Sequence, residues 1–490
     1  MTIRSLLLAA AASAGLAACT VGPNYRPPET GVPAAFTEPQ PPASAAGVDP
    51  ATWWRAFGDP TLDRLVEAAL ADNPDIAVAA SRIREARLAE IGARAVGRPQ
   101  VNASANVTHI ELSRNAGFAS LARQFSGGAS GEQPAGGITL PGGGITTYAL
   151  GFDASWELDL FGGGRLQVEA ATARTAAAEF NRADAAVSLA AEVAQAYFAL
   201  RFDQEQARVI EGELQSQRRA LGLAENQARV GLVPAVDTTR QRQQITATEA
   251  RLEPVRADIR LRTHALALLT GREPGAWPEL ATPATLAPAP VVPAGLPSDL
   301  LRRRPDIRAA ERRLAAATAD IGVAVADLYP RFSLTGVAQL ISAGLGNLLE
   351  TDSLQGTGSG GVSFPLFDSG RRRANVDIRR EQREQAYQQY RATVLAALRD
   401  VEDPLAQIDA ERRRNAALAR AVADAEATVR STEAQYRAGL ANQTPLLDAQ
   451  TALLQARENK AQSDAQLRQQ TAALFKALGG GWSEGRLAPA

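Results

Sequence analysis

The 490-residue sequence predicts a mainly α-helical protein that also carries a few long strands, each with one apolar and one polar face. Three observations predict this fold class. Long segments rich in Ala, Arg and Gln repeat apolar residues at helical spacing. A stretch that begins at Thr147 alternates strictly between apolar and polar residues as far as Leu160, which is the period of a strand. The same order of elements then occurs a second time along the chain.

Two segments predict the longest helices. No proline occurs from Arg165 to Val230, and this segment would span roughly 100 Å at the rise of an α-helix. A segment of similar length runs from Arg371 to Ala438, where Pro404 predicts a kink. Two shorter helices of roughly 55 Å are expected over Thr61–Val96 and Pro234–Leu269. The expected buried faces carry Leu62, Leu65, Ala69, Ile76 and Ile83 in the first short helix, and Leu189, Val193, Tyr197 and Leu200 in the first long one.

Four motifs recur in the same order, so we interpret the chain as two diverged copies of one unit. The pairs are Asn73-Pro74-Asp75-Ile76 with Arg304-Pro305-Asp306-Ile307, Leu158–Arg165 with Phe364–Arg371, Arg229–Leu232 with Arg437–Leu440, and Leu269–Gly271 with Ala477–Gly479. The helical patterns that follow the first pair end at Pro99 and Pro330. We expect a signal peptide at 1–18, a Pro-rich N-terminal segment at 19–60, the first repeat at 61–273, a Pro-rich connector at 274–297, the second repeat at 298–482 and a tail at 483–490.

Each repeat contains two predicted strands, at Pro99–Leu112 and Thr146–Phe161 in the first and at Tyr329–Ser342 and Gly358–Phe367 in the second. Four strands cannot close a membrane barrel, which begins at about eight, and an open edge in lipid costs several kcal/mol for each unpaired group. The strands must therefore be shared between chains, and three copies would supply about twelve. A soluble β-sandwich, the alternative, would need more strands in each repeat.

In that arrangement the apolar face of Tyr148–Leu160 meets lipid, and three acidic residues of the same segment face an aqueous lumen. These residues are Asp153, Glu157 and Asp159. Glycines then mark a sharp turn from strand to helix in both repeats, at Gly162, Gly163 and Gly164 and at Gly370. The alternative of a phosphate-binding loop lacks the GxxxxGK[ST] pattern.

Charge and composition exclude several classes of function. Basic and acidic residues number 52 and 53, so no net field points to a nucleic acid partner. The chain has two histidines, His109 and His264, and one cysteine, Cys19, so neither an internal disulfide nor a metal site is expected. No nucleophile elbow or paired acid and base is present, so we expect no enzymatic activity and no catalytic cofactor.

The N-terminus has the pattern of a secretory signal, in which Arg4 precedes an apolar run that ends in small residues before Cys19. Cys19 lies where a lipoprotein signal is cleaved and its cysteine acylated, so we expect an N-acyl diacylglycerol group there. The alternative is a free buried cysteine beside an ordinary cleavage site. Thr20 replaces the Asp that usually marks retention at the inner membrane, which predicts a lipid-anchored protein of the outer membrane of a Gram-negative bacterium.

Taken together, these motifs resemble the TolC-like outer-membrane efflux proteins, in particular the lipoprotein branch that serves multidrug pumps of the RND type. The matching residues cover nearly the whole mature chain. They are Cys19–Tyr25, Trp53-Trp54, Phe57–Pro60, Asn73–Ile76, Arg303–Ile307, Ala310-Glu311, Ile321–Ala324, Tyr329-Pro330, Leu447–Gln450 and Ala477–Trp482. The resemblance implies an elongated homotrimer with a 12-strand barrel, four strands per chain, continued by a 12-helix periplasmic barrel. It also implies a passive exit duct for small molecules such as drugs, with a periplasmic adaptor and an inner-membrane pump as partners.

The resemblance further implies a constriction at the periplasmic helix-turn-helix ends, which fall here at Val230–Asp237 and Ala438–Asp448. Asp448 matches an acidic residue of the family, and Asp237 occupies a similar place in the first repeat. Rings of such carboxylates favour cations. Thr451 and Thr444 stand where the family can carry a basic residue and a bulky apolar one.

A purely structural role for both acids is the alternative at these ends. With Thr444 as N-cap and Pro445 as first helical residue, Asp448 would lie near a helix start and be favoured by the helix dipole. Asp237 follows Pro234 in the same way. Two alternative functions also remain at this point: a lipid-anchored periplasmic coiled-coil adaptor or scaffold, and the outer-membrane duct of a type I protein secretion system.

Overall fold

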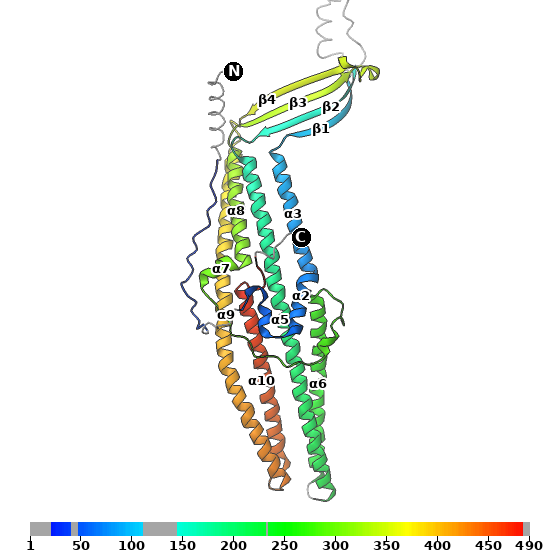
Figure 1. Cartoon of the computed structure of the whole chain (residues 1–490), viewed down its shortest axis with the longest axis vertical. Helices are drawn as coiled ribbons and strands as arrows, with labels where there is room; N and C mark the ends of the chain where they lie inside the picture. The colour runs from blue at the N-terminus through cyan, green and yellow to red at the C-terminus, as the bar shows by residue number, and fades with distance from the viewer. Residues whose placement is uncertain (1–20, 41–47, 111–144, 232–233, 484–490) are drawn as a thin grey trace, which may run out of the picture. The chain divides into compact units, whose positions relative to one another are not determined.

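The computed structural model describes residues 21–40, 48–110, 145–231 and 234–483 (Figure 1). The chain divides into two compact units. Unit 1 comprises residues 1–25, 89–171 and 316–383, and unit 2 comprises 26–88, 172–315 and 384–490. The long helices run through both units, so neither unit is a continuous stretch of sequence. Among the described residues, no helix combines the length and the apolar character that a membrane crossing requires.

Unit 1 contains a four-stranded antiparallel sheet in the order β1-β2-β3-β4 (Figure 1). Its strands are β1 (Gln100–Ile110), β2 (Ile145–Leu158), β3 (Arg331–Ser342) and β4 (Leu354–Ser363). The first repeat contributes β1 and β2 and the second contributes β3 and β4. The two repeats therefore meet at the pairing of β2 with β3, where Leu158 lies opposite Phe332.

The strand ends differ most from the sequence prediction in β4 and at the end of β2. β4 begins at Leu354 and ends at Ser363, earlier at both ends than the predicted Gly358–Phe367. Pro365 explains the early end, because a proline has no N–H to give to a neighbouring strand. β2 ends at Leu158 instead of Phe161, and a turn that leads into the next helix follows at once.

The described parts of the chain contain eight α-helices. They are α2 (Pro60–Asp72), α3 (Pro74–Val96), α5 (Gly163–Arg229), α6 (Ala235–Leu269), α7 (Pro297–Arg303), α8 (Pro305–Ala326), α9 (Arg371–Arg437) and α10 (Gln443–Ala477). The two long helices have 67 residues each, and the two that follow them have 35 each. The order of helix pair, two strands, long helix and shorter helix thus occurs twice.

The single helix predicted over Thr61–Val96 is wrong, because the chain breaks at Asn73. Asn73 is extended, with φ −67° and ψ 128°, and Pro74 starts the next helix. A proline disfavours helical backbone at the preceding residue, which accounts for the break. The second repeat breaks in the same way at Arg304 before Pro305. Prolines inside helices have a different outcome, since α6 continues through Pro254 and α9 through Pro404.

The described part of unit 2 contains a large apolar core and a second, smaller apolar cluster. Trp53 and Trp54 are almost fully buried, and Trp53 stacks on Phe475 with ring centroids 5.0 Å apart. The predicted buried faces are confirmed, since all nine of their residues lie in the core of the protein: Leu62, Leu65, Ala69, Ile76, Ile83, Leu189, Val193, Tyr197 and Leu200. The core therefore joins the segment before α2 with the first long helix and with the end of α10.

Candidate functional site

The sheet of unit 1 has two faces of opposite character. Residues that pair across antiparallel strands lie on the same face. One row across the sheet consists of Ala105, Leu150, Leu340 and Leu354. The neighbouring row on the other face consists of Ser104, Gly151, Gln339 and Gln355. The alternation predicted for β2 thus extends over all four strands.

The apolar face of this sheet is uncovered in a single copy. Phe152 is 61% exposed, and Val107 and Val362 are exposed to a similar degree. A soluble protein rarely leaves a contiguous apolar surface of this kind open to water. The sheet therefore needs lipid or another apolar medium on this side and water on the other.

The polar face carries two of the three acidic residues assigned to it. Asp153 accepts a hydrogen bond from the Asn102 amide at 3.0 Å. Glu157 lies on the same face, 3.9 Å from the Arg331 guanidinium. The prediction for Asp159 is wrong, because β2 ends one residue before it. Its carboxylate instead accepts the backbone N–H of Arg165 at 2.8 Å, and so it caps the first turn of α5.

The predicted glycine turns lie between strand and helix in both repeats. Gly162 has φ 82° and precedes the start of α5, and Gly370 has φ 86° and precedes α9. Backbone in this region favours glycine because a side chain would clash with the following carbonyl. At Gly164 a Cβ atom would lie 3.3 Å from the Asp159 carboxylate, and at Gly163 it would lie 3.1 Å from Ala326. Close approach thus favours small residues at these two positions.

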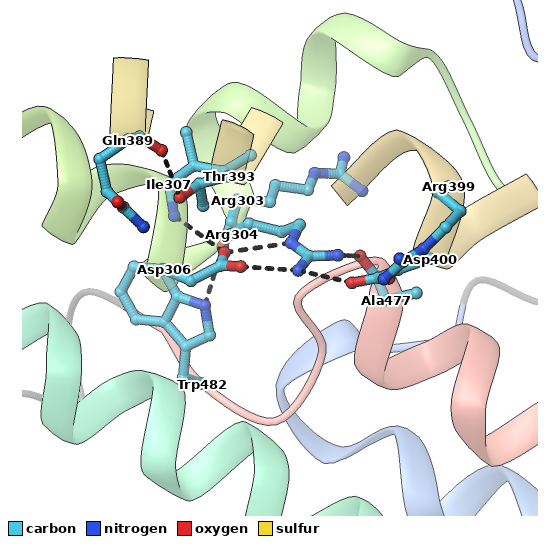
Figure 2. A network of polar contacts seen from close by, with 10 residues as sticks. All are labelled: Arg303, Arg304, Asp306, Ile307, Gln389, Thr393, Arg399, Asp400, Ala477 and Trp482. Carbon is cyan, nitrogen blue, oxygen red and sulfur yellow. Dashed lines mark hydrogen bonds and ion pairs between the residues drawn. The ribbon is translucent and has the colours of Figure 1, made fainter. Parts of the chain in front are cut away.

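In the second repeat the helix break holds a charged network that the sequence analysis did not identify (Figure 2). Arg304 is 8% exposed and donates to both carboxylate oxygens of Asp306, at 3.0 and 2.6 Å. It also donates to Asp400 of α9 at 3.2 Å and to the carbonyl of Ala477 at the end of α10 at 3.0 Å. Burial opposes the charge on Arg304, but the bonds and charges of Asp306 and Asp400 outweigh burial and raise its pKa.

The first repeat makes the equivalent connection with a neutral side chain. The Asn73 amide donates to the carbonyl of Leu269 at the end of α6, at 2.9 Å. Leu269 and Ala477 are the first residues of a repeated motif, so Asn73 and Arg304 join the same places in the two repeats. The repeated motif already indicates that Asn73 and Arg304 are equivalent, because both stand directly before Pro-Asp-Ile.

Asp237 lies in the first turn of α6, and its side chain is only 13% exposed. Its carboxylate is 3.9 Å from the guanidinium of Arg240. Burial, and then the charge of Asp237, raise the pKa of Tyr436, which lies near the end of α9. Asp237 therefore has neighbours that account for its position without an aqueous pore.

Asp448 is placed differently. α10 begins at Gln443 with Asn442 as its N-cap, so the expectation that Thr444 is the N-cap is wrong. No acidic residue lies in the first turn of α10, and Asp448 is exposed one turn further on. Since the helix dipole acts mainly within the first turn, it gives no strong reason for an acid at this position. The two aspartates of the helix ends are thus in unlike surroundings.

Cys19 lies outside the described residues. His109 hydrogen-bonds Thr146 through its Nδ1 at 2.8 Å. Within the described ranges, no three side chains of His, Cys, Asp or Glu are grouped so that they could hold a metal ion.

Comparison with known proteins adds to this geometry. The profile of the outer membrane efflux protein family matches residues 65–272 and 296–480. The pyoverdine export outer membrane protein OpmQ of Pseudomonas putida is 30% identical over 485 residues, 98% of each chain. The toluene efflux pump outer membrane protein TtgC of Pseudomonas putida is 31% identical over 494 residues, which cover 98% of this chain and 96% of TtgC.

Among solved structures, the outer-membrane channel OprN is similar, with a TM-score of 0.83 and 32% sequence identity. The similarity covers 95% of this chain and all of the OprN chain.

Proposed function

Because this chain belongs to the outer membrane efflux protein family and is an outer-membrane exit channel, we propose that three copies form one duct that serves a periplasmic adaptor and an inner-membrane pump of the RND type. Its fold is that of the TolC-like channels, which combine a β-barrel with an α-helical barrel. The sheet of unit 1 carries the proposal. Both its faces are exposed, and β1 and β4 each leave one edge unpaired among the described residues.

Closing the sheet through further copies removes these edges. In lipid an unpaired backbone group costs several kcal/mol, so a row of them at each edge would not be stable. Three copies with four strands each supply about twelve strands, which is within the range of outer-membrane barrels. The apolar face then meets lipid, and the face that carries Asp153 and Glu157 surrounds an aqueous lumen.

The duct itself carries out no catalysis and is passive. It lowers the barrier to crossing the outer membrane by offering a wet path, and the pump supplies the energy. One relative is named for the export of pyoverdine and another for the efflux of toluene. These names support small organic molecules as the cargo here. An N-acyl diacylglycerol group on Cys19 anchors each copy to the membrane.

Asp448 lines the periplasmic aperture in this proposal, and Asp237 stabilises the start of α6 from the side. The support is the contrast between an exposed carboxylate beyond the first helical turn and one with 13% exposure near Arg240. Three copies of Asp448 around one axis would favour cations and bind divalent ions weakly.

Single-channel conductance of the purified protein in a planar bilayer tests this function. We expect small, cation-selective currents for the unmodified protein. Asp448→Ala should enlarge the currents and move the cation-to-anion permeability ratio towards one. Asp237→Ala should alter the selectivity much less. Asp424→Ala is the matched control, because Asp424 is an exposed acid of α9 that lies away from the helix end.

The possible outcomes separate the parts of the proposal. Currents from all variants, with unchanged selectivity in Asp448→Ala, would keep the duct and remove Asp448 from its aperture. A loss of selectivity in Asp237→Ala alone would reverse the roles of the two aspartates. Folded, membrane-inserted protein that passes no current would contradict the duct.

A further inference from the structure

The internal repeat supplies a template for the contact between copies. Within one chain the end of the first repeat's sheet, β2, pairs with the start of the second repeat's sheet, β3, and Leu158 lies opposite Phe332. Each of these two residues has a counterpart in the other repeat. Leu158 opens the motif that recurs from Phe364, and Phe332 stands two residues after Pro330, as Val101 stands two residues after Pro99.

We infer that β4 of one copy pairs antiparallel with β1 of the next copy, in the register that places Phe364 opposite Val101 of the next copy. The inference rests on the proposed assembly of three copies and goes beyond it by fixing which residues meet. The described edges of β4 and β1 are the two that the four-stranded sheet leaves open.

The side chains agree with this register on both faces. On the apolar face it places Val362, Gly360 and Gly358 opposite Ala103, Ala105 and Val107 of the next copy. On the polar face it places Ser363, Ser359 and Thr357 opposite Asn102, Asn106 and Thr108 of the next copy. A slip by one residue would turn every side chain of the partner strand to the wrong face. The register therefore preserves the division into a lipid face and a lumen face.

Barrel closure gives an independent check. The observed pairs lead from Val101 through Ala154 and Gly336 to Gly358, and the inferred pair leads on to Val107 of the next copy. Each copy thus adds a stagger of about six residues, and three copies add about eighteen over twelve strands. With a rise of about 3.3 Å and a strand spacing of about 4.8 Å, this stagger tilts the strands by about 45°.

Strands of membrane barrels tilt by about 35–45°. The nearest registers that keep the same faces have staggers of about four and eight residues per copy, with tilts of about 35° and 54°. The stagger of about eight residues lies outside this range and is excluded, whereas the choice of about six over about four rests on the repeat.

The same correspondence assigns a partner to an exposed aromatic residue. In the first repeat Phe161 stacks on Tyr329, with ring centroids 4.7 Å apart. Its counterpart Phe367 is 88% exposed in a single copy. The counterpart of Tyr329 is Arg98, so the ring of Phe367 would lie against the guanidinium of Arg98 of the next copy. Arginine binds an aromatic face well, and this contact would exclude water where strand turns into helix.

Disulfide trapping with one fixed cysteine tests the register. Ser359→Cys is combined in turn with Ser104→Cys, Asn106→Cys or Thr108→Cys. All three partners lie on the polar face of β1, two residues apart, so they report registers that differ only in stagger. Directly opposite residues have Cβ atoms about 4.5–5.5 Å apart and diagonal ones about 7–8 Å, so a disulfide should form in one pair only. The four single-cysteine variants control for links through Cys19 or random collision.

We expect oxidation of the full-length protein in outer membranes to give a covalent trimer with Ser359→Cys and Asn106→Cys, which reverts to single chains on reduction. A trimer from the Ser104 or Thr108 pair instead would overturn the register but keep the three-copy assembly. No link in any pair, in protein that light scattering finds trimeric, would overturn the pairing of β4 with β1. Protein that is monomeric in mild detergent would contradict the proposed assembly itself.

Discussion

Replacing Arg304 by methionine should weaken the contacts that join the start of α8 to α9 and to the end of α10. The substitution removes a charge that is 8% exposed, together with four hydrogen bonds to Asp306, Asp400 and the Ala477 carbonyl. Removing one partner of a buried ion pair costs about 3–5 kcal/mol, because the remaining charges stay without compensation. The carboxylates of Asp306 and Asp400 keep 25% and 35% exposure, so water partly compensates them, and Arg399 still donates to Asp400 at 2.8 Å. We therefore expect Arg304→Met to lower the free energy of local opening at this helix break by about 3 kcal/mol, near the lower limit of that range.

Hydrogen exchange followed by mass spectrometry measures this local opening. A loss of about 3 kcal/mol corresponds to about a hundredfold faster exchange. It should be confined to peptides at the start of α8 and at the end of α10, which the Arg304 network joins. Arg304→Asn should lose less protection from exchange than Arg304→Met. In the first repeat the Asn73 amide donates to the Leu269 carbonyl and also accepts the Asp75 N–H, so an asparagine can both join the two helices and cap the next one.

Arg302→Met is the matched control for this experiment. Arg302 is 77% exposed and pairs only with Asp299 among the described residues, and such pairs contribute about 0–1 kcal/mol. Unchanged exchange at both places in Arg304→Met would refute the reasoning. Equally fast exchange throughout unit 2 would show that Arg304 supports the whole unit and does not act as a local connection.

Three further predictions concern stability and can be checked by thermal unfolding in detergent. Gly271→Ala should lower the free energy of unfolding by about 2–4 kcal/mol, because φ is 67° and the new Cβ would lie 2.3 Å from the carbonyl oxygen of Asp72. Gly58→Ala is the control, since φ is 65° but no atom lies near the new Cβ, and it should lower the free energy of unfolding by about 1 kcal/mol. Equal losses in the two would contradict a role for close approach. Burial, and then the charge of Asp306, raise the pKa of Asp184. The folded state therefore binds the proton of Asp184 more tightly than the unfolded chain does, and Asp184 lowers the stability of the protein as the pH rises through its folded pKa. Asp184→Asn should then raise the melting temperature at pH 7.5 but not near pH 4. An advantage that grows at low pH would refute this sign. The Tyr436 hydroxyl is buried with no hydrogen-bond partner in the described residues, so Tyr436→Phe should be neutral or stabilise by up to about 1 kcal/mol, and a clear loss would reveal a partner.

The sequence predicted the elements of the fold well where a single period decides the outcome. The alternation around Phe152 and the helical spacing of Leu189, Val193 and Tyr197 each allow one interpretation, and the structure confirms both. The repeated motifs likewise placed the strands and the long helices within a few residues.

The breaks and the charged connections required three-dimensional information. The helical spacing of apolar residues continues from Leu62 to Ile83 across Pro74, so the pattern alone predicts one helix. A proline does not always end a helix, since α6 and α9 continue through Pro254 and Pro404. The contacts of Arg304 join residues 96 and 173 positions apart, which no local pattern reveals. The unlike surroundings of Asp237 and Asp448 also depend on where α10 begins, and Thr444 and Asn442 are both good N-cap residues by type.

The open edges of the sheet have a genetic consequence. In a ring closed by three copies, every copy must offer a sound β1 to one neighbour and a sound β4 to the other. One chain with a damaged edge therefore spoils the ring it enters. In a cell that makes normal and damaged chains in equal amounts, only about one ring in eight contains normal copies alone. Edge mutations of this kind should therefore be dominant over the normal gene, whereas mutations that unfold unit 2 before assembly should be recessive.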